Sequence, residues 1–184
     1  MKILHIDSSI NGNNSVSRIL SSATIDQLKK RYPAAEIVRR DLGLEPLPHF
    51  TLDAFSDQSI VDEFLAADTV VIGAPMYNFG VASQLKAWMD RIAIAGKTFR
   101  YTEQGPVGLA GTKLVIIASS RGGFFGPGSP TASLDHQETY LRTFFEFLGV
   151  TNIHFIRAEG IAMGPEIREK AIKEAQSEVL KFAA

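Results

Sequence analysis

Hydrophobic and polar positions change their period repeatedly along the chain, and each change predicts a different element of secondary structure. Short uncharged runs rich in β-branched residues are typical of strands buried on both faces, as in parallel sheets covered by helices. The clearest run begins at Thr69, and we expect it to end at Pro75, because proline has no N–H to donate to a neighbouring strand. The other predicted strands are Lys2–Asp7, Glu36–Asp41, Lys113–Ser119 and Asn152–Arg157.

Between these runs, apolar residues recur at the spacing of an amphipathic helix. The first such stripe consists of Val16, Ile19, Leu20, Ala23 and Leu28. The remaining predicted helices are Ser59–Ala67, Ser83–Ala95, Gln137–Leu148 and Pro165–Phe182. Two segments lack a helical period: Leu42–Asp57, which is long enough to be a functional loop or a cover, and Phe99–Pro106, a short extended excursion.

Strands that alternate with helices predict an α/β fold with three layers, in which a five-stranded parallel sheet has helices on both faces. Right-handed crossovers reduce the possible strand orders, and a phosphate-type loop after the first strand favours the flavodoxin-like order 2-1-3-4-5. No repeat or linker divides the sequence, so we expect residues 1–184 to form one domain.

Composition and charge restrict the possible functions. The net charge is −1 and the basic residues are scattered, so the chain has no electrostatic footprint for nucleic acid. Without cysteine there is no disulfide, thiolate nucleophile or cysteine-based zinc site, and we expect no metal. No apolar stretch approaches the roughly 20 residues that span a bilayer, and the amino terminus does not resemble a signal peptide. We therefore expect a cytoplasmic protein that does not act at a membrane.

The loop after the first strand carries the first candidate binding groups. Ser9, Ser15 and Ser17 surround the predicted start of a helix, and Gly12 loosens the backbone between them. Hydroxyls at a helix amino terminus form an uncharged cradle for phosphate. Ser15 could instead only cap the helix. Because neither G-x-G-x-x-G nor G-K-[ST] is present, a dinucleotide fold and a P-loop are both excluded.

Two further strand-end loops have the composition of a site for a flat ring. Met76, Tyr77, Asn78 and Phe79 follow the third strand, and they offer flat apolar faces and an amide group. Ser120, Arg121, Gly122 and Gly123 follow the fourth, where the missing Cβ atoms allow the backbone to approach a ring closely. Each loop alone could be an ordinary turn. In the order 2-1-3-4-5 the three loops are neighbours, and together they favour flavin mononucleotide (FMN) as the ligand.

The same segments resemble those of the FMN-dependent NADH:quinone oxidoreductases and azoreductases of flavodoxin-like fold. The likeness spans nearly the whole chain and is carried by Ser8-Ser9, Ser15-Val16-Ser17, Ala74–Phe79, Thr98–Glu103, Ser120–Gly123 and Ala158–Ala162. It implies that Ser9 and Ser15–Ser17, Val16 included, hold the FMN phosphate, and that Met76–Phe79 and Ser120–Gly123 hold the ring. The sequence departs from the family pattern in the segments Leu47–Asp57 and Phe124–Ser133, which touch the acceptor pocket.

The resemblance also implies a reaction and a set of partners. NADH gives a hydride to flavin N5 and leaves, and a quinone or an aromatic azo compound then takes its place, which is a ping-pong sequence. No side chain is assigned as a catalytic acid or base. His5 and His154 lie in strand patterns typical of packing residues, whereas His49 and His136 lie in loops and could face the pocket.

We also expect a homodimer. The helix Ser83–Ala95 is apolar too far around for one sheet contact, so a second surface must cover it. Ala87, Trp88 and Ile94, with the excursion Phe99–Tyr101, are predicted to form a self-complementary patch about a two-fold axis. By resemblance, aromatic residues of the second subunit complete the acceptor pocket, and Tyr101 and Phe147 are the candidates, with Phe124 and Phe125 as further pocket residues. Tyr101 and Phe147 could instead be local packing residues.

Three other functions are compatible with parts of this pattern. A flavodoxin electron carrier is typically strongly acidic, whereas this chain is nearly neutral. A signalling receiver domain needs an aspartate at the end of the third strand, where this sequence has Gly73-Ala74-Pro75. A flavin-binding module that senses without turnover differs from an enzyme only in activity.

Overall fold

The computed structural model describes residues 1–183, and the last residue of the predicted domain, Ala184, lies outside them. In this range, five parallel strands form a sheet of order β2-β1-β3-β7-β8. Since β7 and β8 are the fourth and fifth parallel strands along the chain, the predicted order 2-1-3-4-5 is confirmed. The strands are β1 (Lys2–Asp7), β2 (Glu36–Asp41), β3 (Thr69–Tyr77), β7 (Leu114–Ser120) and β8 (Asn152–Ala158).

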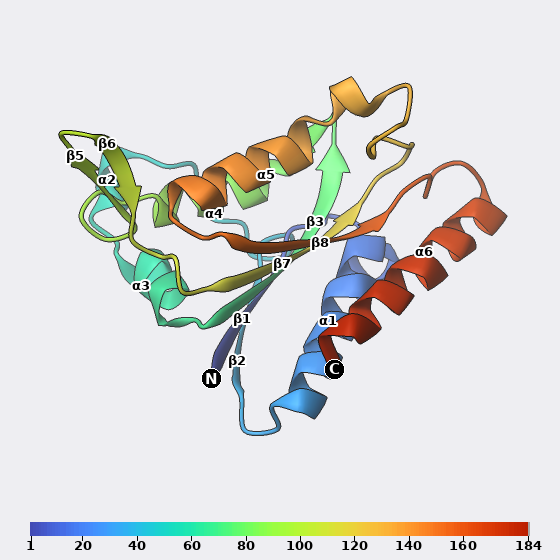
Figure 1. Ribbon diagram of the computed structural model, residues 1–184, viewed down its shortest axis with the longest axis horizontal. Helices are drawn as coiled ribbons and strands as arrows, with labels where there is room; N and C mark the ends of the chain where they lie inside the picture. Colours follow the sequence, from blue (N-terminus) through green and yellow to red (C-terminus); the bar gives the residue numbers. More distant parts are fainter. Residues whose placement is uncertain (184) are drawn as a thin grey trace.

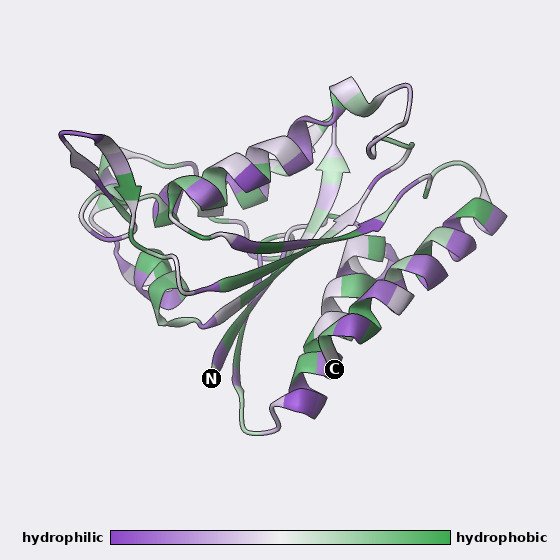
Figure 2. Ribbon diagram, viewed as in Figure 1, coloured by the Kyte–Doolittle hydropathy of each residue, from purple (hydrophilic) through white to green (hydrophobic). Residues whose placement is uncertain are grey.

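Helices cover both faces of the sheet, as predicted. Figure 1 shows α1 (Val16–Arg31) and α6 (Pro165–Val179) together on one face, and α3 (Ser59–Ala66), α4 (Ser83–Ile92) and α5 (His136–Phe147) on the other. Two buried apolar clusters correspond to these two faces, one containing Leu20 and Ala175, the other containing Phe64, Trp88 and Phe145. The hydrophobic residues follow the sheet and the inward helix faces in Figure 2. Short 3-10 turns occupy Gly12–Asn14, Ala132–Leu134 and Leu180–Ala183.

The expected end of the central strand at Pro75 is wrong, because β3 continues to Tyr77 and Pro75 pairs with Ser120 of β7. The carbonyl of Gly73 accepts a hydrogen bond from the amide of Ser8, so Gly73 directs its polar groups toward the β1 side. Residues two apart in a strand point the same way, so the nitrogen of Pro75 also faces that side, where β1 has already ended. Its missing N–H therefore removes no ladder bond.

Two short antiparallel hairpins accompany the parallel strands, one joined to the main sheet and one forming a separate two-stranded sheet. Met76 and Tyr77 pair with an antiparallel strand, β4 (Gly80–Val81). The predicted excursion is also a hairpin, made of β5 (Phe99–Thr102) and β6 (Gly105–Gly108). It lies at one end of the molecule, beside the carboxyl end of α5 (Figure 1).

The prediction that Ala87, Trp88 and Ile94 are left uncovered by their own chain is wrong. Trp88 is fully buried, and Ala87 and Ile94 are each only 6% exposed within a single chain. Phe64 of α3 packs edge-on against Trp88 with ring centroids 5.9 Å apart. The segment Leu42–Asp57, which contains the short helix α2 (Leu52–Phe55), covers the neighbouring part of α4, since Arg91 donates to the carbonyl of Pro48 at 3.0 Å. The cover that the apolar pattern requires thus comes from the same chain.

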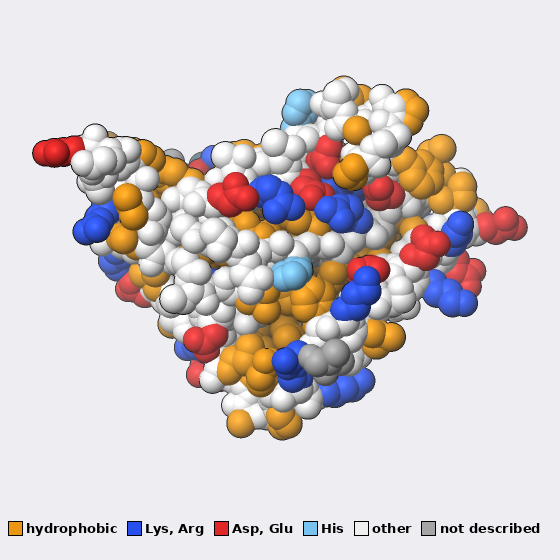
Figure 3. Space-filling view, viewed as in Figure 1, with side chains coloured by type: hydrophobic (Ala, Val, Ile, Leu, Met, Phe, Trp, Pro, Cys, Tyr) orange, Lys and Arg blue, Asp and Glu red, His pale blue; other side chains and the backbone are white. Residues whose placement is uncertain are grey.

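Across the described residues, none of the helices combines the length and apolar character needed to cross a bilayer. On the face drawn in Figure 3, basic and acidic side chains are interspersed rather than gathered by sign.

Candidate functional site

The loop after β1 leads into α1 through a group of serine residues. Ser15 is the N-cap of α1, and its hydroxyl accepts a hydrogen bond from the amide of Arg18 at 3.3 Å. The hydroxyls of Ser15 and Ser17 lie 3.0 Å apart, and the first turn contains no acidic residue. Ser9, Ser15, Val16 and Ser17 are all nearly or fully buried. Because unpaired amides and the helix dipole favour negative charge at such a terminus, this is where an anion can bind.

Tyr77, at the end of β3, connects this loop to the centre of the sheet. Its hydroxyl accepts a hydrogen bond from the amide of Ile10 at 3.2 Å and lies 3.3 Å from the hydroxyl of Ser9. Ser9 in turn accepts from the amide of Asn11 at 3.2 Å. The loops after β1 and β3, which are far apart in the sequence, are therefore joined at the candidate site.

The turn after Tyr77 has an unusual backbone. Tyr77 pairs with Gly80, so Asn78 and Phe79 are the two central residues of a tight hairpin, with φ of 48° and 70°. Positive φ at both positions is the signature of a type I′ turn, where asparagine is favoured and a bulky aromatic is not. Phe79 is nevertheless there, with its side chain 45% exposed. A strained aromatic held at a strand end is a feature of binding sites.

The glycine-rich loop after β7 is anchored by the segment after β8. The amide of Arg121 donates to the carbonyl of Ala158 at 2.9 Å, and the carbonyl of Gly122 accepts from the amide of Ala162 at 3.1 Å. Further along, Phe125 donates its amide to the carboxylate of Glu159 at 2.8 Å. These bonds hold Gly122 and Gly123 beside the β3–β4 turn, since Ser120 pairs with Pro75.

Arg121 was expected to line the site, but its side chain does not. It is completely buried, and its guanidinium contacts three carboxylates, those of Asp135 at 2.9 Å, Glu138 at 3.2 Å and Glu159 at 3.3 Å. Arg121 thus stabilises the glycine-rich loop from inside the protein. A guanidinium fits this role because its planar fork can bond several acceptors at once.

Arg121 and its three carboxylates form an ion-pair cage, and Glu138 connects this cage to two more arginines, Arg142 and Arg157. Both of its oxygens accept from Arg157, at 2.6 and 2.7 Å, and one accepts from Arg142 at 3.3 Å. Burial raises the pKa of Glu138, but the hydrogen bond and charge of Arg157, with the charge of Arg121, outweigh it and leave that pKa below its usual range. The hydrogen bond from Arg157 to Glu138 also raises the pKa of Arg157. The sequence predicted none of Asp135, Glu138 and Glu159 as site residues, although Glu159 lies within a motif that carries the family resemblance.

A second buried charge lies beneath the loop after β1. Asp7 is 1% exposed, accepts from Ser21 at 2.8 Å and lies 3.5 Å from His5. Burial raises its pKa, but the hydrogen bond and charge of His5, with Ser21 and Arg18, outweigh it, and the pKa of Asp7 is lowered. His5, expected to be a packing residue, is therefore part of a polar cluster at the end of β1.

Aromatic residues form two separate groups. Phe125 packs edge-on against Phe79 with centroids 5.9 Å apart, and Phe124 is 48% exposed nearby in the sequence. Tyr101 and Phe147 instead flank Phe99 at the other end of α5, with centroids 5.5 and 4.6 Å from its ring. Phe147 packs against the core, as in the local-packing alternative, whereas Tyr101 is 74% exposed. Neither joins the serine and glycine loops of its own chain.

The other three histidines do not belong to a buried polar cluster. His49, His136 and His154 are exposed. The backbone amide of His136 donates to the carbonyl of Phe79 at 3.1 Å, so His136 borders the β3–β4 turn. His154 bonds to Asn152 at 2.9 Å and lies edge-on to Phe182, so its predicted packing role holds only at the surface.

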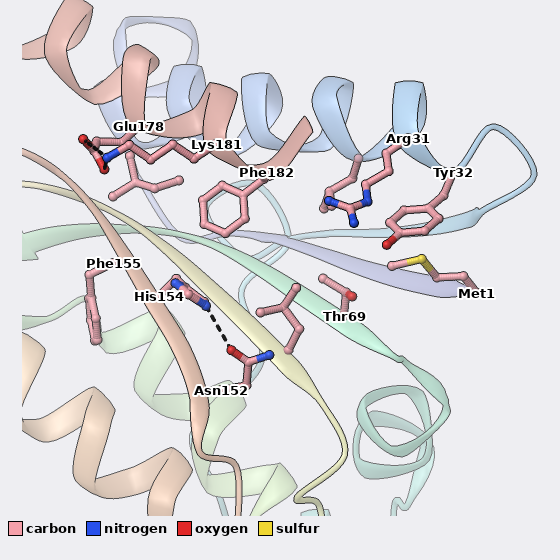
Figure 4. Close-up of a pocket in the computed structure, with 13 residues that line it drawn as sticks. Met1, Arg31, Tyr32, Thr69, Asn152, His154, Phe155, Glu178, Lys181 and Phe182 are labelled. Carbon is pink, nitrogen blue, oxygen red and sulfur yellow. Dashed lines mark hydrogen bonds and ion pairs between the residues drawn. The ribbon is translucent and has the colours of Figure 1, made fainter. Parts of the chain in front are cut away.

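A cavity of about 530 Å³ lies at the opposite end of the sheet, where β3, β7 and β8 begin. Figure 4 shows Glu178 paired with Lys181 and Asn152 paired with His154 in its lining. These polar groups bind one another, and the cavity touches none of the loops described above. We therefore do not include it in the candidate site.

Comparison with known proteins agrees with this geometry. Residues 1–183 match the model of a family described as having a flavodoxin-like fold. The FMN-dependent NADH:quinone oxidoreductases of Rhizobium meliloti (strain 1021) and Bradyrhizobium sp. (strain BTAi1) are 53% and 52% identical to this chain, and all of both chains is covered in each comparison.

Solved structures show the same arrangement. The azoreductase of Bacillus anthracis str. Sterne is 30% identical, with a TM-score of 0.89 over 100% of this chain and 98% of that one. An FMN-dependent NADH-azoreductase of Bacillus anthracis str. Ames Ancestor, solved in complex with FMN, is 27% identical, with a TM-score of 0.86 over 100% of this chain and 99% of that one. The chain belongs to the flavodoxin-like family of FMN-dependent NADH:quinone oxidoreductases.

Proposed function

We propose that this chain is an FMN-dependent NADH:quinone oxidoreductase whose cofactor lies across the loops after β1, β3 and β7. The observation that carries the proposal is the contact between Tyr77 and Ser9, because it joins an anion cradle to an aromatic turn in one site. This occurs in a chain half identical to enzymes of that name.

The residues present fit FMN. The cradle has three hydroxyls and no carboxylate in the first helical turn, which suits a phosphate dianion. At Gly122, an added Cβ would meet only Ala162, at the ordinary distance of 3.5 Å. The fold itself therefore does not require glycine there, and a closely approaching ligand supplies a reason for it.

When bound, FMN supplies hydride transfer from the nicotinamide to the acceptor. The chain's own residues bind and orient it: Ser9, Ser15 and Ser17 hold the phosphate, and Phe79 and Met76 line the ring. The amides of the Tyr77–Phe79 segment are the donors that we assign to the ring edge that gains negative charge on reduction. No titrating side chain is needed for this stabilisation.

We further propose that the enzyme is a homodimer whose sites need both chains. Tyr101 supports this proposal, because its ring is largely exposed on a hairpin distant from its own chain's serine and glycine loops. An exposed aromatic on a projecting hairpin is suited to close a site on a second copy. The Ala87–Ile94 patch no longer supports the dimer, since it is covered within one chain.

NADH and the acceptor are proposed to occupy one place in turn, and aromatic azo compounds are proposed as slower acceptors than quinones. The test is initial-rate kinetics of the purified protein with NADH and benzoquinone, then with an azo dye, after the released cofactor has been chromatographed. FMN and parallel double-reciprocal lines support the proposal. FAD, or no turnover of benzoquinone with FMN present, contradicts the assigned function, and intersecting lines contradict the shared place.

A further inference from the structure

Arg18 holds the loop after β1 from two directions. Its backbone amide donates to the hydroxyl of Ser15, and its guanidinium donates to the backbone carbonyl of Ser9 at 2.9 Å. One residue therefore contacts both ends of the segment that carries the cradle hydroxyls. Because the guanidinium is bound to a carbonyl of the loop, it fixes the path of the backbone there.

Asp41, the last residue of β2, holds the guanidinium in turn. Both of its carboxylate oxygens accept from Arg18, and one of them also accepts from the amides of Gly43 and Leu44 at 3.1 Å each. The hydrogen bond from Arg18 outweighs burial and lowers the pKa of Asp41, so the carboxylate is ionised at neutral pH. A bidentate arginine–carboxylate pair is directional as well as strong.

Gly43 shows how closely this support is packed. A Cβ built at Gly43 would lie 2.3 Å from the carbonyl oxygen of Ser9 and 2.7 Å from Nη2 of Arg18. Since real Cβ atoms do not approach so closely, a side chain there would displace the bond between Arg18 and Ser9. The backbone after β2 is thus pressed against the serine loop.

We propose that Arg18 and Asp41 act as a clamp that positions the serine loop for the phosphate of the cofactor, and that they are positioning residues rather than phosphate ligands. The inference rests on the proposed function, because it takes FMN as the ligand. It extends that function to Arg18 of α1 and Asp41 of β2, which are not among the residues assigned above to the phosphate or the ring.

The clamp and a simple charge effect predict opposite changes in FMN affinity for Asp41→Asn. If the charges acted only by attraction and repulsion, Asp41→Asn would remove a negative charge near the phosphate and tighten FMN binding. If the carboxylate positions Arg18, the same change weakens FMN binding, because the amide group of asparagine faces a second donor. Arg18→Lys keeps the positive charge but replaces the planar fork by a single nitrogen, which cannot reproduce the two bonds to Asp41 and the bond to Ser9 in this geometry. Charge alone therefore predicts no loss for this variant.

The experiment measures the dissociation constants of FMN and of riboflavin, which lacks the phosphate, for wild-type protein freed of its cofactor. Variants Asp41→Asn, Arg18→Lys and Gly43→Ala are compared with it. We expect each to weaken FMN binding roughly tenfold, the size of one lost charge-assisted hydrogen bond, and to leave riboflavin binding unchanged. The ratio of the two constants is the readout that a merely structural role would not move.

The matched control is the ion pair between Arg40, the neighbour of Asp41 on β2, and Glu63 of α3. Arg40 bonds to Glu63 with two contacts of 2.9 Å, and neither residue touches the serine loop. Arg40→Lys and Glu63→Gln should leave both dissociation constants unchanged. If Asp41→Asn does not fold, Arg18→Lys decides, because it leaves the carboxylate bonds to Gly43 and Leu44 in place.

Four results would overturn the clamp: tighter FMN binding by Asp41→Asn, unchanged binding by Arg18→Lys, an equal loss of FMN and riboflavin, or an equal loss in the control variants. Wild-type protein that binds neither ligand would overturn the proposed function itself. Wild-type protein that prefers FMN, with variants that keep this preference, would overturn only the clamp.

Discussion

The hydroxyl of Tyr77 lies 3.3 Å from the hydroxyl of Ser9, although 68 positions separate the two residues in the sequence. This contact joins the loops after β1 and β3 at the carboxyl ends of adjacent parallel strands. In open α/β sheets, ligands bind at such a place. Tyr77 therefore links the part of the site that holds a phosphate to the part that holds a ring.

Tyr77→Phe should weaken FMN binding roughly fivefold, because the ring stays while a hydrogen bond worth about 1 kcal/mol is lost. Flavin fluorescence titration measures the change. Tyr32→Phe is the control, since Tyr32 lies in the cavity at the opposite end of the sheet. Equal affinity of Tyr77→Phe and wild-type protein would show that the junction does not shape the site.

Ser15→Asp should abolish FMN retention without unfolding the protein. Aspartate caps a helix as well as serine does, but its charge repels a phosphate at the same place. Ser15→Asn is the matched variant, since asparagine caps without charge and should keep most of the cofactor. The flavin-to-protein absorbance ratio and the melting temperature are measured for both. Full retention of FMN by Ser15→Asp contradicts the phosphate assignment.

Phe79→Gly should be more stable than Phe79→Ala by about 1 kcal/mol, the reverse of the usual order of the two residues. Both variants lose the ring and its contact with Phe125, so their difference isolates the backbone at φ of 70°. Urea unfolding measures it. Both should also lose quinone reduction relative to wild type, because the exposed ring is gone. A more stable alanine variant would mean that the turn carries no strain.

Acidification should release the ion-pair cage around Arg121. The pKa of Glu138 is lowered in the folded protein from its ordinary value of 4.5. The unfolded chain therefore binds the proton first as pH falls, so this stabilisation is present above about pH 4.5 and is lost as pH falls through the folded pKa. Glu138→Gln should lower the free energy of unfolding at pH 7 by roughly 2 kcal/mol and flatten its decline below pH 5. Unfolding by urea at several pH values measures this. A decline as steep as in wild type would assign the acid sensitivity to other carboxylates.

Mixing two inactive variants tests whether the site needs both chains. Tyr101→Ala should bind FMN normally and lose quinone reduction, since the exposed ring is proposed to close the site of the partner. Ser15→Asp should lack FMN but keep Tyr101. After unfolding and refolding together with FMN, mixed dimers would contain one complete site, and activity should return. No recovery, with both variants folded and dimeric, would place Tyr101 outside the site.

Local pattern by itself determined the elements and their layers. Short apolar runs located all five parallel strands, and the 3.6-residue spacing of apolar positions located the helices, because both signals depend only on neighbours along the chain. The order of the strands followed from chirality and from the composition of one loop. The serine, aromatic and glycine loops were recognisable because each ends a strand at the same edge of the sheet.

Tertiary structure decided what each group faces, because that depends on residues distant in the sequence. Pro75 does not end β3, since β1 has already stopped beside it. The apolar side of α4 is covered by α3 and the segment after β2, although the helix alone predicts a second copy. Arg121 follows a strand like a ligand-binding residue, but three carboxylates from later segments bury it. The sequence pattern predicts which side chains are buried. Only the folded chain determines which residues bury them.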